Sequence, residues 1–343
     1  MRPQKTYFIP FVLLLVVLLL CFGINVSLGS VAIPLKETVN AFLGNSAAQD
    51  SSTYIIWNYR IPKAFTAVLV GGGLSVSGLL MQTFFRNPLA GPFVLGISSG
   101  ASLGAALLIM GSSLFSGLLS FNLVNDVSLA VVSSMGSFAV LLSVMVVAAK
   151  VKDSMALLII GLMFGSITAA VVSVLSYFTD AQQLQQYIYW SFGSIGHLSW
   201  AQLAILGTIV IIGMILGIAS IKSLNALLLG ENYARSLGVD IKKSRFLIII
   251  AAGLLAGGIT AFAGPIAFVG LAVPHLTRQI FNTTDHKILV PAVTLYGAIL
   301  LLICDTVAQL PNSASMLPLN AVTSVVGAPV VIWLLVRKRK MVF

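Results

Sequence analysis

Long apolar runs make up most of the chain, and short polar or charged breaks separate them. A helix that crosses the hydrocarbon core of a bilayer needs about 20 mainly apolar residues. Ten runs approach that length, at residues 8–28, 62–84, 92–111, 127–149, 154–177, 199–221, 246–263, 265–281, 288–307 and 320–336. The pattern predicts an all-α fold, a polytopic transmembrane bundle of ten helices that forms one domain over residues 1–343.

The division between the seventh and eighth runs is the weakest, because Gly264-Pro265 interrupts one continuous apolar stretch. A Gly-Pro break inside a membrane indicates either a kink or a reversal. The segment Ala263-Gly-Pro-Ile-Ala-Phe-Val-Gly270 also echoes the earlier segment Ala90-Gly-Pro-Phe-Val-Leu-Gly96. Repeated halves are common in transporters, but two short matches do not establish a duplication.

Basic residues provide a test of the number of spans. If the N-terminus lies inside, sixteen of the 19 Lys and Arg residues fall in inner segments, and only Lys36, Arg60 and Lys63 fall in outer ones. Inner loops of membrane proteins carry such an excess of positive charge. The distribution therefore predicts ten spans with both termini in the cytoplasm. It also places an outer loop at residues 29–59 and a cytoplasmic loop at residues 222–245.

The composition agrees with a membrane protein. Hydrophobic residues make up 58% of the chain and charged residues 8%, whereas about 25% is typical of soluble proteins. The net charge of +10 does not indicate a nucleic-acid partner, because the basic residues lie between apolar runs and form no basic face. Arg2 and Lys5 precede the first run as in a signal peptide, but the length of that run favours a retained helix.

Motifs that would indicate catalysis are absent from the sequence. The chain contains no Gly-x-x-x-x-Gly-Lys-Ser/Thr loop, no His-Glu-x-x-His pair and no Gly-x-Ser-x-Gly elbow. Cys21 and Cys304 lie inside apolar runs and form no metal-binding pattern. We therefore expect no enzymatic activity, no catalytic residue, no cofactor and no metal site.

Asp305 is the main candidate for a functional charge inside the membrane, because it lies late in the ninth run. Intramembrane charges are costly and often mark function. One interpretation is an interfacial carboxylate that meets a neighbouring polar group. The alternative is an ion-coupled secondary transporter that uses Asp305.

Small residues recur at four-residue spacing within several runs. The pairs are Gly71/Ser75, Gly73/Ser77, Gly100/Gly104 and Gly253/Gly257. Such faces allow membrane helices to approach closely. We expect these pairs to pack helices within one subunit rather than to form a dimer face.

The cytoplasmic segment Leu227–Asp240 combines a helical apolar pattern with two glycines, Gly230 and Gly238. This pattern predicts two short helices separated by glycine turns. A small amphipathic helix at this position can fit a groove of a soluble partner or lie on the membrane surface. The residues alone leave both alternatives open.

A series of short motifs runs in order along residues 55–337. They are Arg60-Ile-Pro-Lys63, Gly71-Gly-Gly-Leu-Ser-Val-Ser-Gly78, Arg86-Asn-Pro-Leu-Ala90, Leu95-Gly-Ile-Ser-Ser-Gly-Ala101, Trp190-Ser-Phe-Gly-Ser194, Leu229-Gly-Glu-Asn-Tyr-Ala-Arg-Ser-Leu-Gly238 and Gly264-Pro-Ile-Ala-Phe-Val-Gly-Leu-Ala-Val-Pro-His275. No single motif is sufficient, but the ordered set resembles the permease family of iron-siderophore, haem and cobalamin (vitamin B12) ABC importers.

The resemblance implies a transport subunit in the bacterial plasma (inner) membrane that pairs with a second permease copy, most simply as a homodimer. It implies that two cytoplasmic ATP-binding-cassette ATPase subunits power transport, and that an extracytoplasmic substrate-binding protein delivers the cargo. The cargo would be a bulky metal chelate moved by alternating access. The motifs do not distinguish among the three chelates.

The resemblance also assigns the cytoplasmic loop to contact with the ATPase. Its helix would sit in a groove of that subunit, where small residues permit close docking and an arginine can pair with an acid. The residues expected at this contact are Gly230, Ala234, Arg235, Leu237 and Gly238.

Two further groups of residues are candidates, the first from the resemblance and the second from its place on the predicted inner turns. Arg60 and Lys63 match outer positions where basic side chains meet carboxylates of the binding protein. Asn87 and Leu89, together with Ser154, lie on inner turns where a gate would form.

Three positions depart from the family pattern. Gln309 stands where the family often has arginine, Met316-Leu-Pro-Leu-Asn320 replaces Glu-Leu-Pro-x-Gly, and Asn282 stands where glycine is favoured. We interpret the first two as a loss of charge from the surface that meets the delivery protein. Docking through a full set of salt bridges is therefore not expected.

Overall fold

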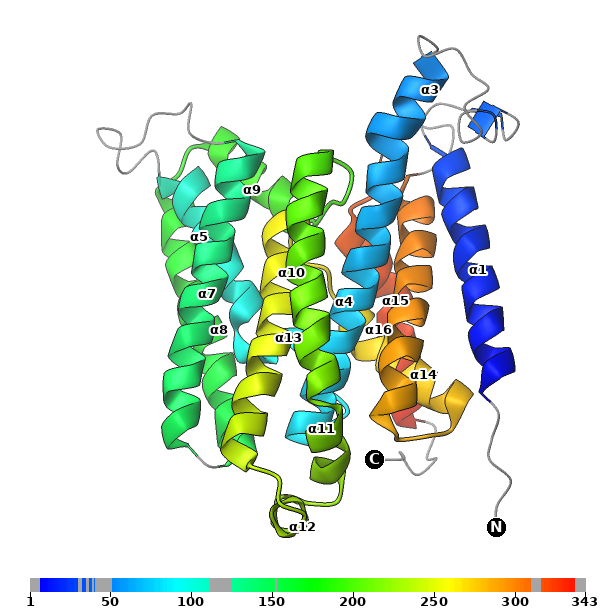
Figure 1. Ribbon diagram of the computed structural model, residues 1–343. Helices are drawn as coiled ribbons and strands as arrows, with labels where there is room; N and C mark the ends of the chain where they lie inside the picture. Colours follow the sequence, from blue (N-terminus) through cyan, green and yellow to red (C-terminus); the bar gives the residue numbers. More distant parts are fainter. Residues whose placement is uncertain are drawn as a thin grey trace.

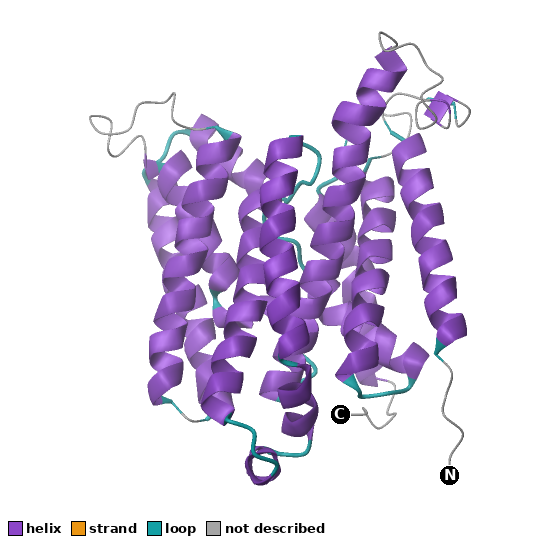
Figure 2. Cartoon of the chain, in the orientation of Figure 1, coloured by secondary structure: helices purple, strands orange, loops and turns teal. Residues whose placement is uncertain are grey.

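The computed structural model describes residues 7–29, 33–34, 37–38, 40, 51–111, 125–151, 153–309 and 316–336. Within these residues every regular element is helical (Figure 2). Most of the predicted outer loop, including Lys36, lies outside the described residues. The elements are α1 (Phe8–Ser27), α3 (Ser51–Ile55), a π-helical turn (Ile56–Arg60), α4 (Ile61–Phe85), a 3-10 turn (Pro92–Leu95), α5 (Ile97–Ile109), α7 (Asp126–Lys150), α8 (Ser154–Tyr177), α9 (Ala181–Ser191), α10 (Trp200–Ala219), α11 (Ile221–Leu228), α12 (Glu231–Ser236), α13 (Ile241–Ala263), α14 (Val269–Phe281), α15 (His286–Ala308) and α16 (Leu319–Val336). The predicted all-α bundle is confirmed.

The long helices run side by side between two ends of the bundle (Figure 1). We call one the α12 end, because α11 and α12 lie there; α1 begins and α16 ends at the same end. We call the other the α3 end. Of the described Lys and Arg residues, only Arg60 and Lys63 belong to segments at the α3 end. The charge asymmetry expected from the sequence therefore holds for the folded chain.

Within the described residues, seven helical segments are long and apolar enough to cross a membrane: α1, the continuous helix from α3 to α4, α7, α8, α10, α13 and α15. The three other predicted runs contain α5, α14 and α16. Both α5 and α14 have 13 residues, which corresponds to about 20 Å in a hydrocarbon core of about 30 Å.

A non-helical segment accounts for the missing length of α14. The chain leaves the helical conformation at Gly264-Pro265, because proline has no N–H for the helix ladder, and α14 begins only at Val269. The carbonyl of Ala263 accepts from Ser194 N (2.8 Å), and Ala267 N donates to Asn320 Oδ1 (3.0 Å). Irregular backbone is tolerated at membrane depth only when protein groups satisfy it in this way. The Gly-Pro break is therefore a structured interruption of the bundle.

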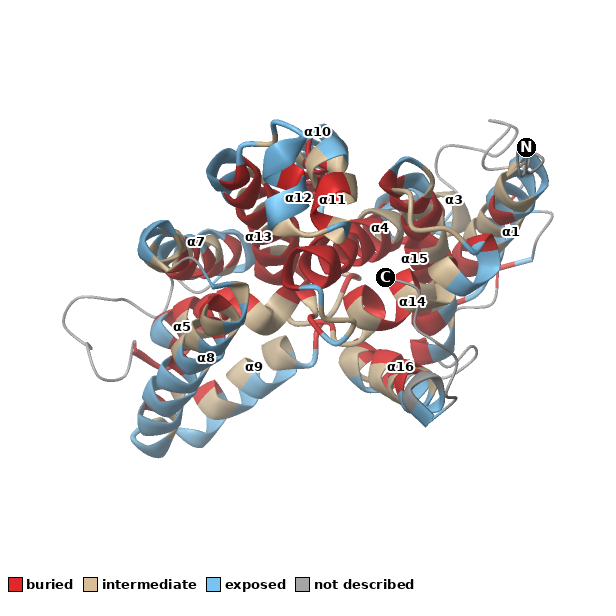
Figure 3. Ribbon diagram, turned by 90° about the horizontal axis from the view of Figure 1, so that it is seen from below, coloured by how far each residue is buried: buried red, intermediate tan, exposed pale blue. Residues whose placement is uncertain are grey.

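Buried residues concentrate on α4, α13 and α15, while exposed residues are frequent on outer helices such as α1 and α8 (Figure 3). In the most apolar window of the α3–α4 segment, 83% of residues are buried, compared with 17% for α1 and for α8. The exposed apolar faces of α1 and α8 are the surfaces that lipid would cover.

Glycines allow the core helices to touch through their backbones. A Cβ atom on Gly71 would meet the carbonyl of Gly297 in α15, and one on Gly100 would meet that of Gly136 in α7. Gly257 of α13 is similarly close to Ser137 of α7. These contacts lie within one chain, which confirms the interpretation of the small-residue pairs as packing within the subunit.

Candidate functional site

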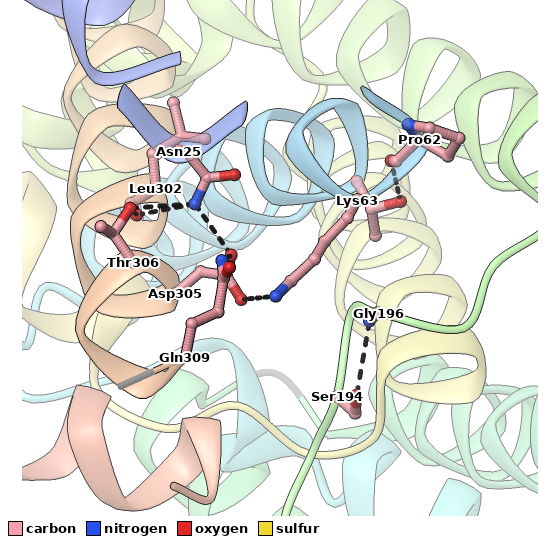
Figure 4. A network of polar contacts seen from close by, with 10 residues as sticks. Asn25, Pro62, Lys63, Ser194, Gly196, Leu302, Asp305, Thr306 and Gln309 are labelled. Atoms are coloured by element: carbon pink, nitrogen blue, oxygen red, sulfur yellow. Dashed lines mark hydrogen bonds and ion pairs between the residues drawn. The ribbon is translucent and has the colours of Figure 1, made fainter. Parts of the chain in front are cut away.

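A buried ion pair joins α4 to α15 at the α3 end. Lys63 Nζ lies 3.1 Å from Asp305 Oδ1, and the two side chains are 14% and 5% exposed. Asn25 Nδ2 and Gln309 Nε2 donate hydrogen bonds of 2.8 and 2.7 Å to Asp305 Oδ2 (Figure 4). One cation and two amide donors therefore offset the cost of burying the carboxylate. This arrangement agrees with the interpretation of Asp305 as a carboxylate that meets neighbouring polar groups.

Arg60 also points into the protein. Its Nη1 donates to the carbonyl oxygens of Val26 (3.0 Å) and Ser27 (2.7 Å), in the last turn of α1, and the residue is 8% exposed. The last carbonyls of a helix lack helical partners and attract cations. Arg60 therefore stabilises the contact between α1 and α4. Docking of a binding protein by Arg60 and Lys63 stays a prediction.

A cavity of about 590 Å³ opens next to these residues at the α3 end. Its lining includes Arg60, Lys63 and Asp305, with His197 from the segment after α9 and Met316 from the segment before α16. Two cations against one carboxylate give this lining a net positive charge.

The departures from the family pattern acquire a structural explanation at two positions. Gln309 is 5% exposed and donates to Asp305, so the substitution changes a buried position and not an outward-facing charge. The interpretation of Gln309 as a lost surface charge is therefore wrong. Asn282 ends α14 with a φ of 47°, a left-handed conformation in which glycine is unstrained and asparagine is the next most common residue.

Replacing Asp305 by alanine is expected to lower the free energy of unfolding by about 3–5 kcal/mol, because it leaves the ammonium of Lys63 buried without a counter-charge. Denaturant unfolding of the purified chain in detergent measures this change. The double variant Asp305→Ala/Lys63→Met should recover most of the loss. The matched control is Asp180→Ala, an exposed acid at the N-cap of α9 whose side chain makes no capping bond. If Asp305→Ala and Asp180→Ala lowered the free energy of unfolding equally, the stabilising role of the buried ion pair would be contradicted.

At the α12 end, the segment predicted to hold two short helices, residues 227–240, contains one, α12 (Glu231–Ser236), while α11 (Ile221–Leu228) lies mostly before it. Gly230 has a φ of 116° and Gly238 a φ of 79°, so a glycine turn lies at each end of α12, as the sequence indicates. Ala234 is fully buried against the body of the protein. The small side chain therefore sets how closely α12 approaches the bundle.

Three large apolar side chains on and beside α12 are exposed. Leu229, Tyr233 and Leu237 are 64%, 53% and 57% exposed. Tyr233 and Leu237 are four residues apart and share a side of the helix. Arg235 is two residues from each and lies on the other side, where it and Glu231 line a cavity with α7 and α13. Arg235 and Leu237 are both exposed, and their contact with the ATPase stays a prediction.

Two polar contacts fasten α11 to the end of α4. Arg86, the last residue of the α4 turn, adopts a left-handed conformation and donates from Nη2 to the carbonyl of Leu227 (2.7 Å). Asn225 Oδ1 lies 2.6 Å from Nδ1 of the buried His286, whose Nε2 lies 2.8 Å from Thr83 Oγ1. A movement of α11 would therefore act directly on the last turn of α4 and the first turn of α15.

Asp285 completes this network as the N-cap of α15. Partial burial acts to raise the pKa of Asp285, but hydrogen bonds from Lys287 N and Asn225 Nδ2 and the nearby cations lower it below its usual value. Asp285 is thus ionised at neutral pH and fixes the orientation of the Asn225 amide. That orientation directs Asn225 Oδ1 at His286.

The three predicted gate residues lie near this network but do not form one cluster. Asn87 Oδ1 accepts from Leu89 N (2.9 Å), so these two residues share a tight turn after α4. The carbonyl of Pro88 in that turn is 2.7 Å from His275 Nε2 in α14. Ser154, at the start of α8, lines a cavity of about 1000 Å³ together with Arg86. The gate assignment stays a prediction.

The sequence reasoning missed Asn25, Gln82, Asn225 and His286. Gln82 Oε1 accepts from Arg278 Nη1 (2.9 Å), and Gln82 Nε2 donates to the carbonyl of Leu271 (3.0 Å), which links α4 to α14. A lone amide such as Asn25 within an apolar run is the signal that could have revealed them. Its partners are far apart in sequence, and periodicity does not reveal them.

The bundle and its membrane-length helices define a multi-pass membrane protein. The model of the FecCD transport family matches residues 15–337. The chain belongs to this family.

Similar proteins of known name cover nearly the whole chain. The hemin transport system permease protein HmuU of Yersinia pestis is 35% identical over 99% of this chain and 98% of its own length. The vitamin B12 import system permease protein BtuC of Vibrio cholerae is 36% identical over 85% of this chain and 86% of its own. A solved structure described as an inward-facing conformation of a metal-chelate type ABC transporter is 27% identical, covers 97% of this chain and 100% of its own, and has a TM-score of 0.81.

Proposed function

We propose that this chain is the membrane-spanning subunit of an ABC importer that carries a bulky metal chelate into the cytoplasm by alternating access. The single observation that supports this most strongly is the match to one permease family over residues 15–337. The similar proteins HmuU and BtuC are named for hemin and vitamin B12, so haem, cobalamin and an iron-siderophore are the cargo classes to test. The membrane is the bacterial inner membrane.

The partners proposed for this subunit are a second permease copy, two cytoplasmic ATPase subunits and an extracytoplasmic binding protein. We assign the α12 end to the cytoplasm, because it carries most of the positive charge. This assignment also places the beginning of α1 and the end of α16 in the cytoplasm.

The coupling contact with the ATPase is assigned to the apolar face of α12. Leu229, Tyr233 and Leu237 expose large side chains at the end of the bundle beyond the spans. Such a face favours insertion into a groove of a soluble partner. Gly230 and Gly238 permit the turns that present it, and buried Ala234 anchors it.

Coupling to the gate follows from the contacts between α11 and α4. Arg86, which directly precedes Asn87, donates a hydrogen bond to the carbonyl of Leu227. When ATP binding moves the loop, this hydrogen bond and the Asn225–His286 contact transmit the displacement to the turn of Asn87 and Leu89. Alternating access requires such a link between two states of the bundle.

Delivery of the cargo is assigned to the α3 end. Arg60 and Lys63 are engaged inside the protein. They would therefore contribute to docking of the binding protein through the positive field of the cavity lining and not through exposed salt bridges. Such a field steers an acidic partner surface and sets its orientation.

Uptake into sealed vesicles tests the function. Vesicles that carry the ATPase subunits on their inner face, with the binding protein and the radiolabelled chelate added outside, should accumulate the chelate only when ATP is enclosed on the ATPase side. Vesicles with the chain alone should show no uptake under a proton or sodium gradient. Gradient-driven uptake without ATPase would instead support the ion-coupled alternative based on Asp305, which the Lys63 pairing disfavours because the charge is already compensated.

A further inference from the structure

A second cavity at the α12 end lies between α7, α12 and α13, on the side of α12 opposite Tyr233 and Leu237. Its volume is about 370 Å³. One part of the lining is charged and the other part is apolar, and the two parts are separated along the helix axes. This separation distinguishes it from the cavity that contains Ser154, whose lining mixes the two kinds of residue.

The charged part lies at the helix ends. Arg235 of α12 and Lys242 in the first turn of α13 line the cavity and are exposed. Among the described residues, neither side chain has an acidic partner within ion-pair distance. The third cation, Arg245, lies 3.3 Å from Glu231, which is the acid in the lining. Among the described residues of the lining, three cations stand against one acid, so the mouth of the cavity carries a net positive charge.

The apolar part lies further along the spans. Met145 and Ala148 belong to the last two turns of α7, and Phe246 and Ile249 belong to the second and third turns of α13. Phe246 is 52% exposed. Both helices are long and apolar enough to cross a membrane, so this wall of the cavity lies at a depth where the surrounding medium is acyl chains.

We propose that this cavity binds an anionic phospholipid of the cytoplasmic leaflet. Arg235 and Lys242 would hold the phosphate, and an acyl chain would lie along Met145, Phe246 and Ile249. The order of the lining, cations at the helix ends and apolar side chains deeper, matches the order of headgroup and chain in a lipid. A soluble partner reaches the cations but not the apolar wall, which favours a lipid over a protein segment.

Lipid binding here would also act on the loop that carries α12. Arg235 is on α12, whereas the apolar wall is on α7 and α13. A phosphate held by Arg235 and Lys242 would therefore fasten α12 to the membrane end of α13 while leaving Tyr233 and Leu237 exposed on the other side. The binding itself does not depend on the chain being an ATP-driven importer.

Native mass spectrometry of the full-length chain tests the proposal, with dioleoyl phosphatidylglycerol and dioleoyl phosphatidylcholine added at equal concentration. We expect the wild-type chain to retain phosphatidylglycerol preferentially. Lys242→Gln should weaken that retention about fivefold, the contribution of one lysine near an anionic lipid surface. Lys243→Gln is the matched control, because Lys243 is exposed and absent from the lining; we expect less than a twofold change.

A second variant tests the apolar part of the cavity. Ala149→Trp fills the lining at an exposed position and should weaken retention of phosphatidylglycerol without changing the unfolding midpoint. Soluble glycerol phosphate should fail to displace the lipid from the wild-type chain. Equal losses for Lys242→Gln and Lys243→Gln, no preference over phosphatidylcholine, or displacement by glycerol phosphate would each overturn the proposal. A loss in the Lys242→Gln variant that appears only when the ATPase subunits are present would assign the cations to that partner and would overturn it too.

Discussion

Replacing Gly78 by leucine is expected to prevent the chain from reaching its folded state. Gly78 of α4 crosses Gly270 of α14, and a Cβ atom on Gly78 would overlap the carbonyl group of Gly270. Extra methylenes in a packed core cost about 1–3 kcal/mol when side chains can shift. Here the obstructing atoms are backbone, so the helices must separate and the cost is larger. The yield of monodisperse protein after detergent extraction measures the loss.

Gly23→Leu is the control for the Gly78 prediction. Gly23 lies in α1, and no atom lies within 4 Å of a Cβ built on it. This variant should be extracted as well as the wild-type chain, which separates a packing defect from a general intolerance of glycine substitution. A monodisperse Gly78→Leu protein with unchanged stability would show that α4 and α14 do not cross at this point.

The second large effect is expected from the double variant Tyr233→Asp/Leu237→Asp. Burying one such side chain contributes about 1.5–3 kcal/mol, and about 1.4 kcal/mol corresponds to a tenfold change in affinity. Loss of both apolar side chains should therefore weaken association with the ATPase subunits by more than tenfold. ATP-driven uptake should fall in parallel. The chain itself should remain folded, because both side chains are more than half exposed. Co-purification of the ATPase subunits and vesicle uptake measure the two effects.

Asn232→Asp provides a matched control for charge on α12. Asn232 is exposed on the same helix and is not one of the three large apolar side chains. We expect this variant to retain the ATPase subunits within a few-fold of the wild-type level. If the double variant also retains them and transports normally, α12 is not the coupling helix and instead lies on the membrane surface.

Asp305 and Gln309 show which part of the site the sequence could predict. The position of Asp305 late in an apolar run was sufficient to expect a polar neighbour near one end of the bundle. Its partners Lys63 and Asn25 are supplied by α4 and α1, and the sequence contains no sign of which helices lie beside α15. Gln309 was therefore interpreted as a surface residue, although it is buried against Asp305.

The sequence by itself determined that the chain lies in a membrane, that its fold is all-α, that its positive charge is concentrated at one end, and that glycine turns flank α12. Apolar runs and glycine positions act locally along the chain, so their effects can be read without knowing the fold. Tertiary structure alone decided that α5 and α14 stop short of a full span, because only the carbonyls and amides of neighbouring segments make a broken backbone stable at that depth. It also decided that Arg60 and Lys63 face inward, since their orientation depends on which helices pack together.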